Sequence, residues 1–411
     1  MKPRRPVLRL RLRLRLRLLL RLPLRPRRGL LDSAALLALA LGLGLGSMGP
    51  GAAAAAADQP AREQTNKTNK PSKPIKPIKP IKPGKPQRAT PAAAGPSYEG
   101  HAEALVFAES LAAERGLDAA WLRGHLAQAR RVEAVRRLVM PPPAGTAKNW
   151  AAYRARFVEP QRINAGLAFW QQHARWLAEA EARWGVPAEV VVAIVGVETF
   201  YGRITGNFRT LDALATLAFD FPPGRKDRSA FFRGELAEFF VLCARENIDP
   251  QQQKGSFAGA MGLPQFMPGS VNRFALDFDE NGYIDLLASG PDVVGSVAHF
   301  LAAHGWERGL PTHFDVAVPV DTRERAVLLA PDILPSFTAA QFVAQGALLP
   351  DAARRHEGLL ALVELQNGEQ APSYVAGTAN FYVITRYNWS SYYAMAVIDL
   401  AAALRNARGP G

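Results

Sequence analysis

Residues 189–202, EVVVAIVGVETFYG, decide how this sequence is interpreted. From Val190 to Val197 every residue is apolar or glycine, so a helix built from this segment has no polar face. A helix that is apolar on all sides is buried in the core of a domain. Glu198 follows in the last turn, although glutamate is rarely buried without a partner. The segment therefore predicts a buried helix that ends in a carboxyl group.

Two interpretations of Glu198 stay open from this segment alone. Burial raises the pKa of a carboxyl group, and a carboxyl that stays protonated near neutral pH can act as a general acid. This interpretation predicts a cleft where the helix ends. In the other interpretation, Glu198 is a structural residue that pairs with a nearby arginine such as Arg203 or Arg209.

Helical periodicity dominates the sequence on both sides of this segment. Gly185 is expected to end the preceding helix, and Pro187 to stand in the first turn of the next. Further helices are expected at 101–114, 117–138, 161–184, 211–218, 229–246, 270–276, 291–304 and 390–404. Strands are expected at 314–320, 359–366 and 381–386, with a turn at Asn367-Gly368. The predicted fold class is mostly α (α+β), with one small β region.

Composition divides the 411 residues into three parts. Residues 1–98 contain 21 of the 50 lysines and arginines but three of the 36 acids, so they carry about +18 and the remainder about −4. The net charge of +14 therefore belongs to the N-terminal quarter, and a nucleic-acid partner is not expected. The predicted parts are a leader at 1–57, a disordered Lys/Pro-rich linker at 58–98 and a folded domain at 99–407.

The leader has the order of a secretory signal peptide. Basic residues precede an apolar run from 35 to 45, which is followed by an alanine-rich zone at 52–57. The run is too short for a transmembrane helix. The single cysteine, Cys243, lies far from that zone and is expected to be a small buried hydrophobe. A soluble, exported protein without a lipoprotein cysteine is therefore expected.

The linker repeats Lys-Pro-Ile between residues 73 and 83. Proline at every third position removes the hydrogen-bond donors that helices and sheets need, so polyproline II is the expected conformation. Two roles stay open for it. One is a solvated spacer, and the other is loose electrostatic contact with an anionic polymer of the cell envelope.

Six segments share a pattern, in order, across residues 100 to 405. They are GVET at 196–199, LDALATL at 211–217, KGSFAGAMG at 254–262, QFMP at 265–268, GSVA at 295–298 and ITRYN at 384–388. This pattern resembles the lytic murein transglycosylase B family. The resemblance implies a lysozyme-like core with an added helical subdomain. It also implies a carbon–oxygen lyase of the Gram-negative periplasm that takes part in cell-wall turnover or remodelling.

The substrate that the resemblance implies is the peptidoglycan glycan strand, in which the MurNAc–GlcNAc β-1,4 bond is cleaved to leave a 1,6-anhydro-muramoyl end. Glu198 matches the family's sole catalytic residue, which first protonates the glycosidic oxygen and then takes the proton of the sugar's C6 hydroxyl. Asp212, the nearest second carboxylate, is interpreted as a first-turn helix residue. Residues that resemble positions lining the saccharide groove are Ser256, Gln265, Tyr387, Asn388 and Tyr393. We expect a monomer that needs no cofactor for catalysis.

An acidic segment at 277–285, DFDENGYID, predicts a calcium loop. Oxygen ligands at positions 1, 3, 5 and 9 and glycine at position 6 form the front half of an EF-hand loop. Ala288 stands where the closing glutamate is expected, and the resemblance offers Asp292 as a later ligand. The expected ligands of a structural Ca²⁺ are Asp277, Asp279, Asn281, the backbone carbonyl of Tyr283, and Asp292. The other interpretation is a solvated acidic turn.

Two other functions stay open at this stage. One is a hydrolytic muramidase that cleaves the same bond with water, which would give a product heavier by one water molecule. The other is a peptidoglycan-binding scaffold without catalysis. In that case Glu198→Gln would keep glycan binding and would cause no loss in an assay of wall clearance.

Overall fold

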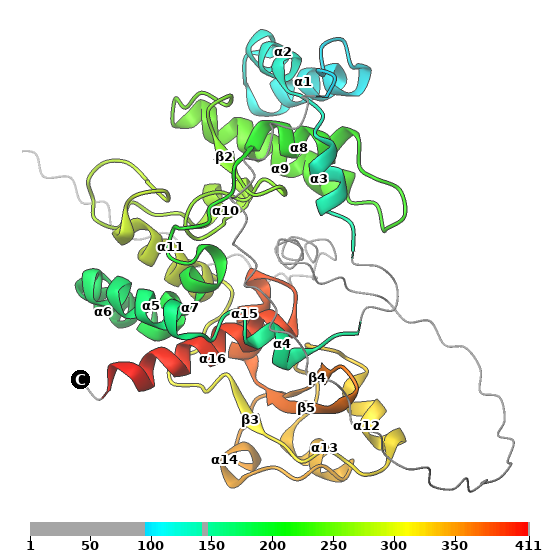
Figure 1. Cartoon of the computed structure of the whole chain (residues 1–411), viewed down its shortest axis with the longest axis vertical. Helices are drawn as coiled ribbons and strands as arrows, with labels where there is room; N and C mark the ends of the chain where they lie inside the picture. The colour runs from blue at the N-terminus through cyan, green and yellow to red at the C-terminus, as the bar shows by residue number, and fades with distance from the viewer. Residues whose placement is uncertain (1–94, 142–146, 410–411) are drawn as a thin grey trace, which may run out of the picture. The chain divides into compact units, whose positions relative to one another are not determined.

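The computed structural model describes residues 95–141 and 147–409 (Figure 1). The predicted leader, 1–57, and the linker up to residue 94 lie outside the described residues. Residues 95–98, predicted as the end of the linker, belong to the fold: Tyr98 is buried and donates a hydrogen bond to Asp220 Oδ2 at 2.6 Å. In the described ranges, no helix has both the length and the apolar character needed to cross a membrane.

The first hydrophobic core surrounds one central helix, α7. Its elements are α4 (Trp150–Arg154), α5 (Pro160–Gln172), α6 (Ala174–Trp184), α7 (Ala188–Thr199), α11 (Gly290–Ala303), α15 (Ala379–Tyr387) and α16 (Ser391–Arg408). Helix α7 packs against α5, α6, α11 and α16 (Figure 1). All residues from Val190 to Val197 are buried, which confirms the predicted helix without a polar face. Gly185 ends α6 with φ 71°, as expected, whereas Pro187 is the N-cap of α7 and precedes its first turn.

A second hydrophobic core belongs to a helical subdomain. Its elements are α1 (Ala102–Arg115), α2 (Ala119–Gln128), α3 (Glu133–Leu138), α8 (Thr210–Phe219) and α9 (Ser229–Arg245). A short antiparallel pair, β1 (Phe208–Arg209) with β2 (Lys254–Gly255), lies beside α8. Helix α10 (Pro268–Phe274) contacts both α9 and α11 and so joins this subdomain to the first core.

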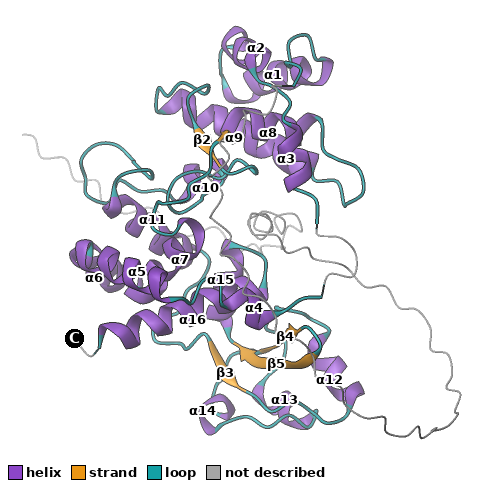
Figure 2. Ribbon diagram, viewed as in Figure 1, coloured by secondary structure: helices purple, strands orange, loops and turns teal. Residues whose placement is uncertain are grey.

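The third core lies in the β region (Figure 2). Its strands are β3 (His313–Asp315), β4 (Ala361–Asn367) and β5 (Gln370–Gly377), and its helices are α12 (Thr322–Leu329), α13 (Ala339–Ala344) and α14 (Asp351–Arg354). The strands form an antiparallel sheet in the order β3-β5-β4. Gly368 takes φ 66° in the β4–β5 turn, which Gly368 and Glu369 form, so the turn predicted at Asn367-Gly368 is present but begins one residue later. The mostly α fold with an added helical subdomain and a small β region is thus as predicted.

The helix predicted at 117–138 is wrong, because the chain is extended between α2 and α3. Ala129 has ψ 147°, and two side chains of α8 hold the extended backbone: Asp212 accepts from Arg130 N at 2.8 Å, and Thr216 accepts from Val132 N at 2.9 Å. These contacts come from residues about 80 positions away, so local periodicity did not reveal them.

Two further elements differ from the prediction. The helix expected at 161–184 breaks at His173, whose ring lies so close to Gly290 that a Cβ there would meet it at 2.0 Å. The strand expected at 381–386 is helix α15, which begins where the side chain of Thr378 accepts a hydrogen bond from Asn380 N. Phe381, Val383 and Ile384 are all buried. Their spacing suits one helical face as well as an alternating strand, and the N-cap decides for the helix.

Candidate active site

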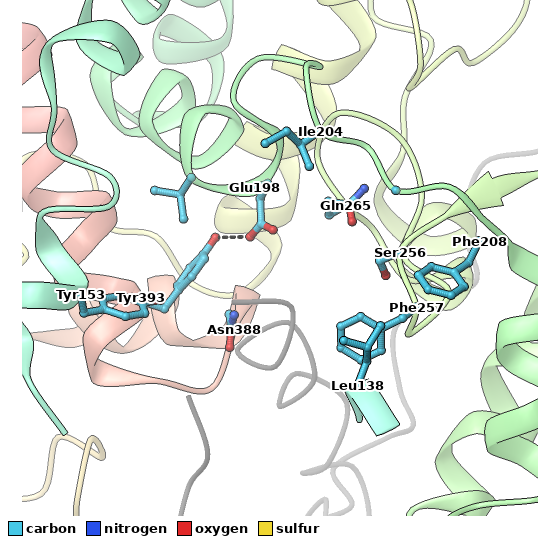
Figure 3. A pocket seen from close by; sticks show the side chains of 12 residues that line it. Leu138, Tyr153, Glu198, Ile204, Phe208, Ser256, Phe257, Gln265, Asn388 and Tyr393 are labelled. Carbon is cyan, nitrogen blue, oxygen red and sulfur yellow. Dashed lines mark hydrogen bonds between the residues drawn. The ribbon is translucent and has the colours of Figure 1, made fainter. Parts of the chain in front are cut away.

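Glu198 lies in the last turn of α7, where the apolar helix meets a cavity (Figure 3). The two residues after the helix, Phe200 and Tyr201, both have left-handed backbones, with φ 52° and 56°. Non-glycine residues adopt this conformation rarely, and usually where the surrounding packing enforces it. Here the left-handed turn ends the helix directly after Thr199, so that Glu198 is held in the last turn of a buried helix.

The ring of Tyr201 supplies that packing. It lies against two helices at glycine positions: a Cβ at Gly166 of α5 would meet Tyr201 Oη at 2.3 Å, and a Cβ at Gly196 of α7 would meet it at 2.5 Å. Arg162 of α5 donates a hydrogen bond to the Gly196 carbonyl at 2.6 Å and stacks on Phe200, with its Cζ 4.5 Å from the ring centre. The end of α7 is therefore fixed by close packing and by a cation.

Burial raises the pKa of the Glu198 carboxyl to about 8. Glu198 is half-buried because it faces the cavity, but protein encloses the carboxyl and removes most of the water that would stabilise its charge. Tyr393 Oη of α16 donates to Glu198 Oε1 at 2.6 Å and opposes this effect by stabilising the charged form (Figure 3). Glu198 is therefore mostly protonated at neutral pH.

A layer of tyrosines surrounds this carboxyl. Burial, and then the negative charge of Glu198, raise the pKa values of Tyr153, Tyr387 and Tyr393, so all three phenols are neutral. Tyr387 Oη donates to the Pro264 carbonyl at 2.5 Å, and its ring stacks on that of Tyr393 at 6.2 Å with 14° between the planes. Tyr387 thus supports the ring that contacts Glu198.

The structure does not pair Glu198 with either candidate arginine, because Glu198 accepts from Tyr393 and both arginines have other partners. Arg209 forms an ion pair with Asp212 at 2.7 Å, and Arg203 stacks on the ring of Phe200 at 4.5 Å. Asp212 lies in the first turn of α8, as interpreted from the sequence, and also accepts from Arg130 N. Its carboxylate is therefore occupied and is not among the groups that line the cavity.

The cavity next to Glu198 has a volume of about 270 Å³. The predicted residues Ser256, Gln265, Asn388 and Tyr393 line it, whereas Tyr387 lies behind Tyr393. Figure 3 shows Tyr393 and Asn388 on one side of Glu198, and Gln265 and Ser256 on the other. These predicted residues come from the end of α15, from α16 and from the loop that follows β2, and they meet Glu198 of α7 in the cavity.

The polar groups in this cavity are arranged for a ligand with hydrogen-bonding groups. Asn388 Oδ1 is buried without a partner among the described residues, and a buried acceptor of this kind costs free energy unless a ligand or water satisfies it. Gln265 has φ 49° and donates through Nε2 to the carbonyls of Thr205 and Gly262. Ser256 Oγ accepts from Ala258 N and Ala260 N, which fixes the loop.

The acidic loop lies between α10 and α11. Oxygen atoms of Asp277, Asp279 and Asp292 lie within 4.8 Å of one another. Asp279 Oδ1 is buried without a partner among the described residues, Asp292 is fully buried, and the three carboxyl groups converge. Oxygen ligands at this spacing suit a hard divalent cation such as Ca²⁺.

The other two predicted ligands lie in the same loop. The side chain of Asn281 is exposed, and its Oδ1 accepts from Tyr283 N at 3.2 Å. The side chain of Tyr283 is also exposed, at 60%. The structure therefore brings the three carboxylates together, and the side chains of Asn281 and Tyr283 are exposed to solvent.

The family model of the transglycosylase SLT domain matches residues 100–402. The chain belongs to this family. It is 38% identical over 322 residues, which are 76% of this chain and 86% of the relative, to the membrane-bound lytic murein transglycosylase B of Escherichia coli strain K12.

Solved structures agree with this assignment. Soluble lytic transglycosylase SltB1 from Pseudomonas aeruginosa is 38% identical, with a TM-score of 0.68, and the match covers 75% of this chain and 100% of that one. The Escherichia coli lytic transglycosylase Slt35 in complex with calcium is 36% identical, with a TM-score of 0.66, and the match covers 77% and 96%. The predicted family, fold and lytic transglycosylase class are confirmed.

Sequence reasoning missed one wall of the transglycosylase cavity. Tyr153 of α4 lies beside Tyr393, and on the opposite side apolar residues stand beside Gln265 and Ser256 (Figure 3). The apolar residues are Leu138, Ile204, Phe208 and Phe257. Ile204 is 65% exposed although it is a large apolar residue, and the sequence pattern around it gave no signal that it lines a cavity.

Proposed function

We propose that this transglycosylase cleaves the MurNAc–GlcNAc β-1,4 bond of peptidoglycan with Glu198 as acid and then base, leaving a 1,6-anhydro-muramoyl end. The observation that carries the proposal is a carboxyl with a pKa of about 8 that opens into a cavity lined by polar and aromatic side chains. Of the described residues that line this cavity, Glu198 is the one carboxyl group. A reaction that needs a single carboxyl group fits this set of lining residues best.

The protonated carboxyl starts the reaction. Glu198 donates its proton to the glycosidic oxygen as the bond from that oxygen to C1 breaks, and the GlcNAc unit leaves with a hydroxyl group. The cation that develops at C1 resembles an oxocarbenium ion. The carbonyl of the substrate's own N-acetyl group stabilises it, together with the dipoles of the site. Tyr393 stabilises the carboxylate formed at this moment, since its hydroxyl already donates to Glu198 Oε1.

The carboxylate completes the reaction. Glu198 takes the proton of the C6 hydroxyl as O6 attacks C1, which closes the 1,6-anhydro ring and restores the protonated carboxyl. No water is consumed, so the second carboxylate that activates water or attacks the sugar in ordinary glycosidases is not required. Asp212, held by Arg209, is unsuited to either role.

Mass spectrometry of released muropeptides tests this proposal. The protein should release fragments that end in anhydro-MurNAc, and Glu198→Gln should lower the rate by at least about a thousandfold while glycan binding persists. Glu189→Gln is the matched control, because it makes the same change at the other end of α7, where Glu189 pairs with Arg405. Products heavier by one water would establish the muramidase instead, and full activity of Glu198→Gln would remove Glu198 from the chemistry.

The acidic loop is proposed to bind a structural Ca²⁺ through Asp277, Asp279 and Asp292, with Asn281 and the backbone carbonyl of Tyr283 completing the shell. The unpartnered Asp279 Oδ1 and the convergence of three carboxylates support it. Such an ion neutralises the loop and ties it to the first turn of α11, which contacts the catalytic helix α7. None of the described cavity-lining residues belongs to this loop, so its role is stability.

Export to the periplasm is the third part of the proposal. The signal-like order of residues 1–57 supports it, as does a substrate that lies outside the cytoplasmic membrane. The lysines of the 58–98 linker suit loose contact with anionic envelope polymers. Cell fractionation tests the location: replacing residues 1–57 with an initiating methionine should retain the protein in the cytoplasm.

A further inference from the structure

A second cavity, of about 470 Å³, lies in the helical subdomain. Its walls are the start of α2 and the turn that follows α9, and it shares no lining residue with the cavity at Glu198. Nothing in the chemistry proposed for Glu198 uses this second cavity. Trp121 and Ile248 give it an apolar surface, and a rim of short polar side chains surrounds them.

The polar rim is held rigidly. Asp118 is the N-cap of α2, and its Oδ1 accepts from Trp121 N at 2.9 Å. Asp249 Oδ1 accepts from Gln251 N at 2.9 Å, and Gln251 Nε2 donates to the His125 carbonyl at 3.1 Å, which ties the turn to α2. The second carboxylate oxygen of Asp118 and of Asp249 has no hydrogen-bond partner in the described part of the chain. A rim fixed in this way binds a ligand without losing side-chain entropy.

The charge of this cavity limits the kind of ligand it can hold. Burial lowers the pKa of the His125 imidazole, which outweighs the opposite effect of Asp249, so the ring is neutral at pH 7. The carboxylates of Asp118 and Asp249 are then the charges of the lining, and they repel phosphates and carboxylates. Burial raises the pKa of Cys243 to about 12, so its thiol is not a nucleophile. The suitable ligands are donors of hydrogen bonds.

Between the two classes of donor, the lining favours a sugar over an ammonium group. A pyranose presents an apolar C–H face, which an indole such as Trp121 can cover, and hydroxyl groups at its edge, which carboxylates accept. The Asn247 side chain adds an amide donor and acceptor of the kind that pairs with an N-acetyl group, and its backbone is held at φ 52°. An ammonium ion would leave the apolar surface at Ile248 without a partner.

We propose that this cavity is a second glycan subsite, which binds an N-acetylamino sugar of a peptidoglycan strand away from the point of cleavage. The inference rests on the proposed function, because it takes the polymer that Glu198 cleaves as the ligand. Its effect is retention: the enzyme stays on an insoluble wall between cleavage events because one strand is held in two places.

Fluorine NMR of the full chain tests binding directly. The seven tryptophans are labelled as 5-fluorotryptophan, and Trp121→Phe assigns the Trp121 signal. Titration with tri-N-acetylchitotriose should shift this signal saturably, and Asp249→Asn should weaken the binding about five- to tenfold, because a charged hydrogen bond becomes a neutral one. Glu114→Gln, an exposed acid outside the lining, is the matched control and should titrate like the parent. A signal that moves with cadaverine and not with the sugar overturns the proposal, as does one that moves with neither.

Activity on two substrates separates this subsite from the cleavage site. Asp249→Asn should raise the amount of sacculi needed for half-maximal rate about fivefold and leave the turnover of a two-disaccharide soluble glycan unchanged. Equal kinetics of Asp249→Asn and the parent on sacculi would overturn the proposal. If the proposed function itself is wrong, the parent cleaves neither substrate, and the fluorine titration still decides whether the sugar binds at Trp121.

Discussion

Removing one hydroxyl group beside Glu198 should change the pH dependence of the enzyme in a defined direction. The carboxyl has a pKa of about 8 because desolvation raises it more than the 2.6 Å hydrogen bond from Tyr393 lowers it. Tyr393→Phe deletes the stabilising contribution and keeps the desolvation. The pKa of Glu198 should therefore rise further, and the carboxyl should become a weaker acid.

The size of the change follows from the bond that is lost. A hydrogen bond to a charged group contributes about 1.5–3 kcal/mol, and one pH unit corresponds to about 1.4 kcal/mol. The alkaline limb of kcat/KM, where Glu198 loses the proton that it must donate, should move upward by about 1–2 pH units. The plateau rate should fall about tenfold or more, because the carboxylate formed during bond cleavage loses the same stabilisation.

The assay is the pH profile of anhydro-muropeptide release from a soluble glycan, followed from pH 5 to 10.5. Tyr392→Phe is the control, since it removes a hydroxyl from the neighbouring residue of α16 that bonds to the backbone of Gln366 instead of Glu198. Its alkaline limb should coincide with that of the parent. A limb in Tyr393→Phe that stays in place or moves to lower pH would refute the account of how Glu198 is tuned.

The remaining predictions concern stability. Because the pKa of Glu198 in the fold lies above its ordinary value of 4.5, the contribution of this carboxyl is complete below about pH 4.5 and is lost progressively as the pH rises to 8. Glu198→Gln should therefore match the parent at pH 4 and exceed it by about 4 kcal/mol at pH 8 in denaturant titrations, and a constant difference would contradict this. Calcium at a hundred times its dissociation constant should raise the melting temperature of the parent and of Glu280→Gln by about 5 °C, but not that of Asp279→Asn. An equal response in all three proteins would exclude this loop as the calcium site. Gly196→Ala should lower the free energy of unfolding by about 1–3 kcal/mol, because the new methyl group would overlap the ring of Tyr201. Gly234→Ala, on an open face of α9, should raise the free energy of unfolding by about 0.5–1 kcal/mol in the same measurement.

The central helix and its carboxyl could be predicted because their signals are local. A helix with eight consecutive residues that lack a polar side chain must be buried. The glutamate that follows must then either pair with a cation or have a raised pKa. Sequence could not choose between these two outcomes, because the deciding group, Tyr393, comes 195 positions later. The family resemblance named Tyr393 as a groove residue, and the structure adds what its hydroxyl contacts.

Elements decided by distant contacts were predicted poorly. The breaks at Ala129 and His173 contain neither glycine nor proline. The first depends on side chains of α8, and at the second the ring of His173 lies against Gly290 at the start of α11. Tyr153 was missed for a related reason: it lies on a five-residue helix, 45 positions before Glu198, with no periodicity of its own. Such residues reach the site through the tertiary fold, which the local sequence pattern does not predict.

The cavity at Glu198 takes its walls from two different hydrophobic cores, with Tyr393 belonging to the first and Phe208 and Phe257 packed in or against the second. An inhibitor that touches both walls would act as a brace, since detaching either core would require its release. Compounds that contact both the tyrosine side and the phenylalanine side should therefore slow proteolysis of both cores. Smaller compounds that contact one side should protect only the core to which that side belongs.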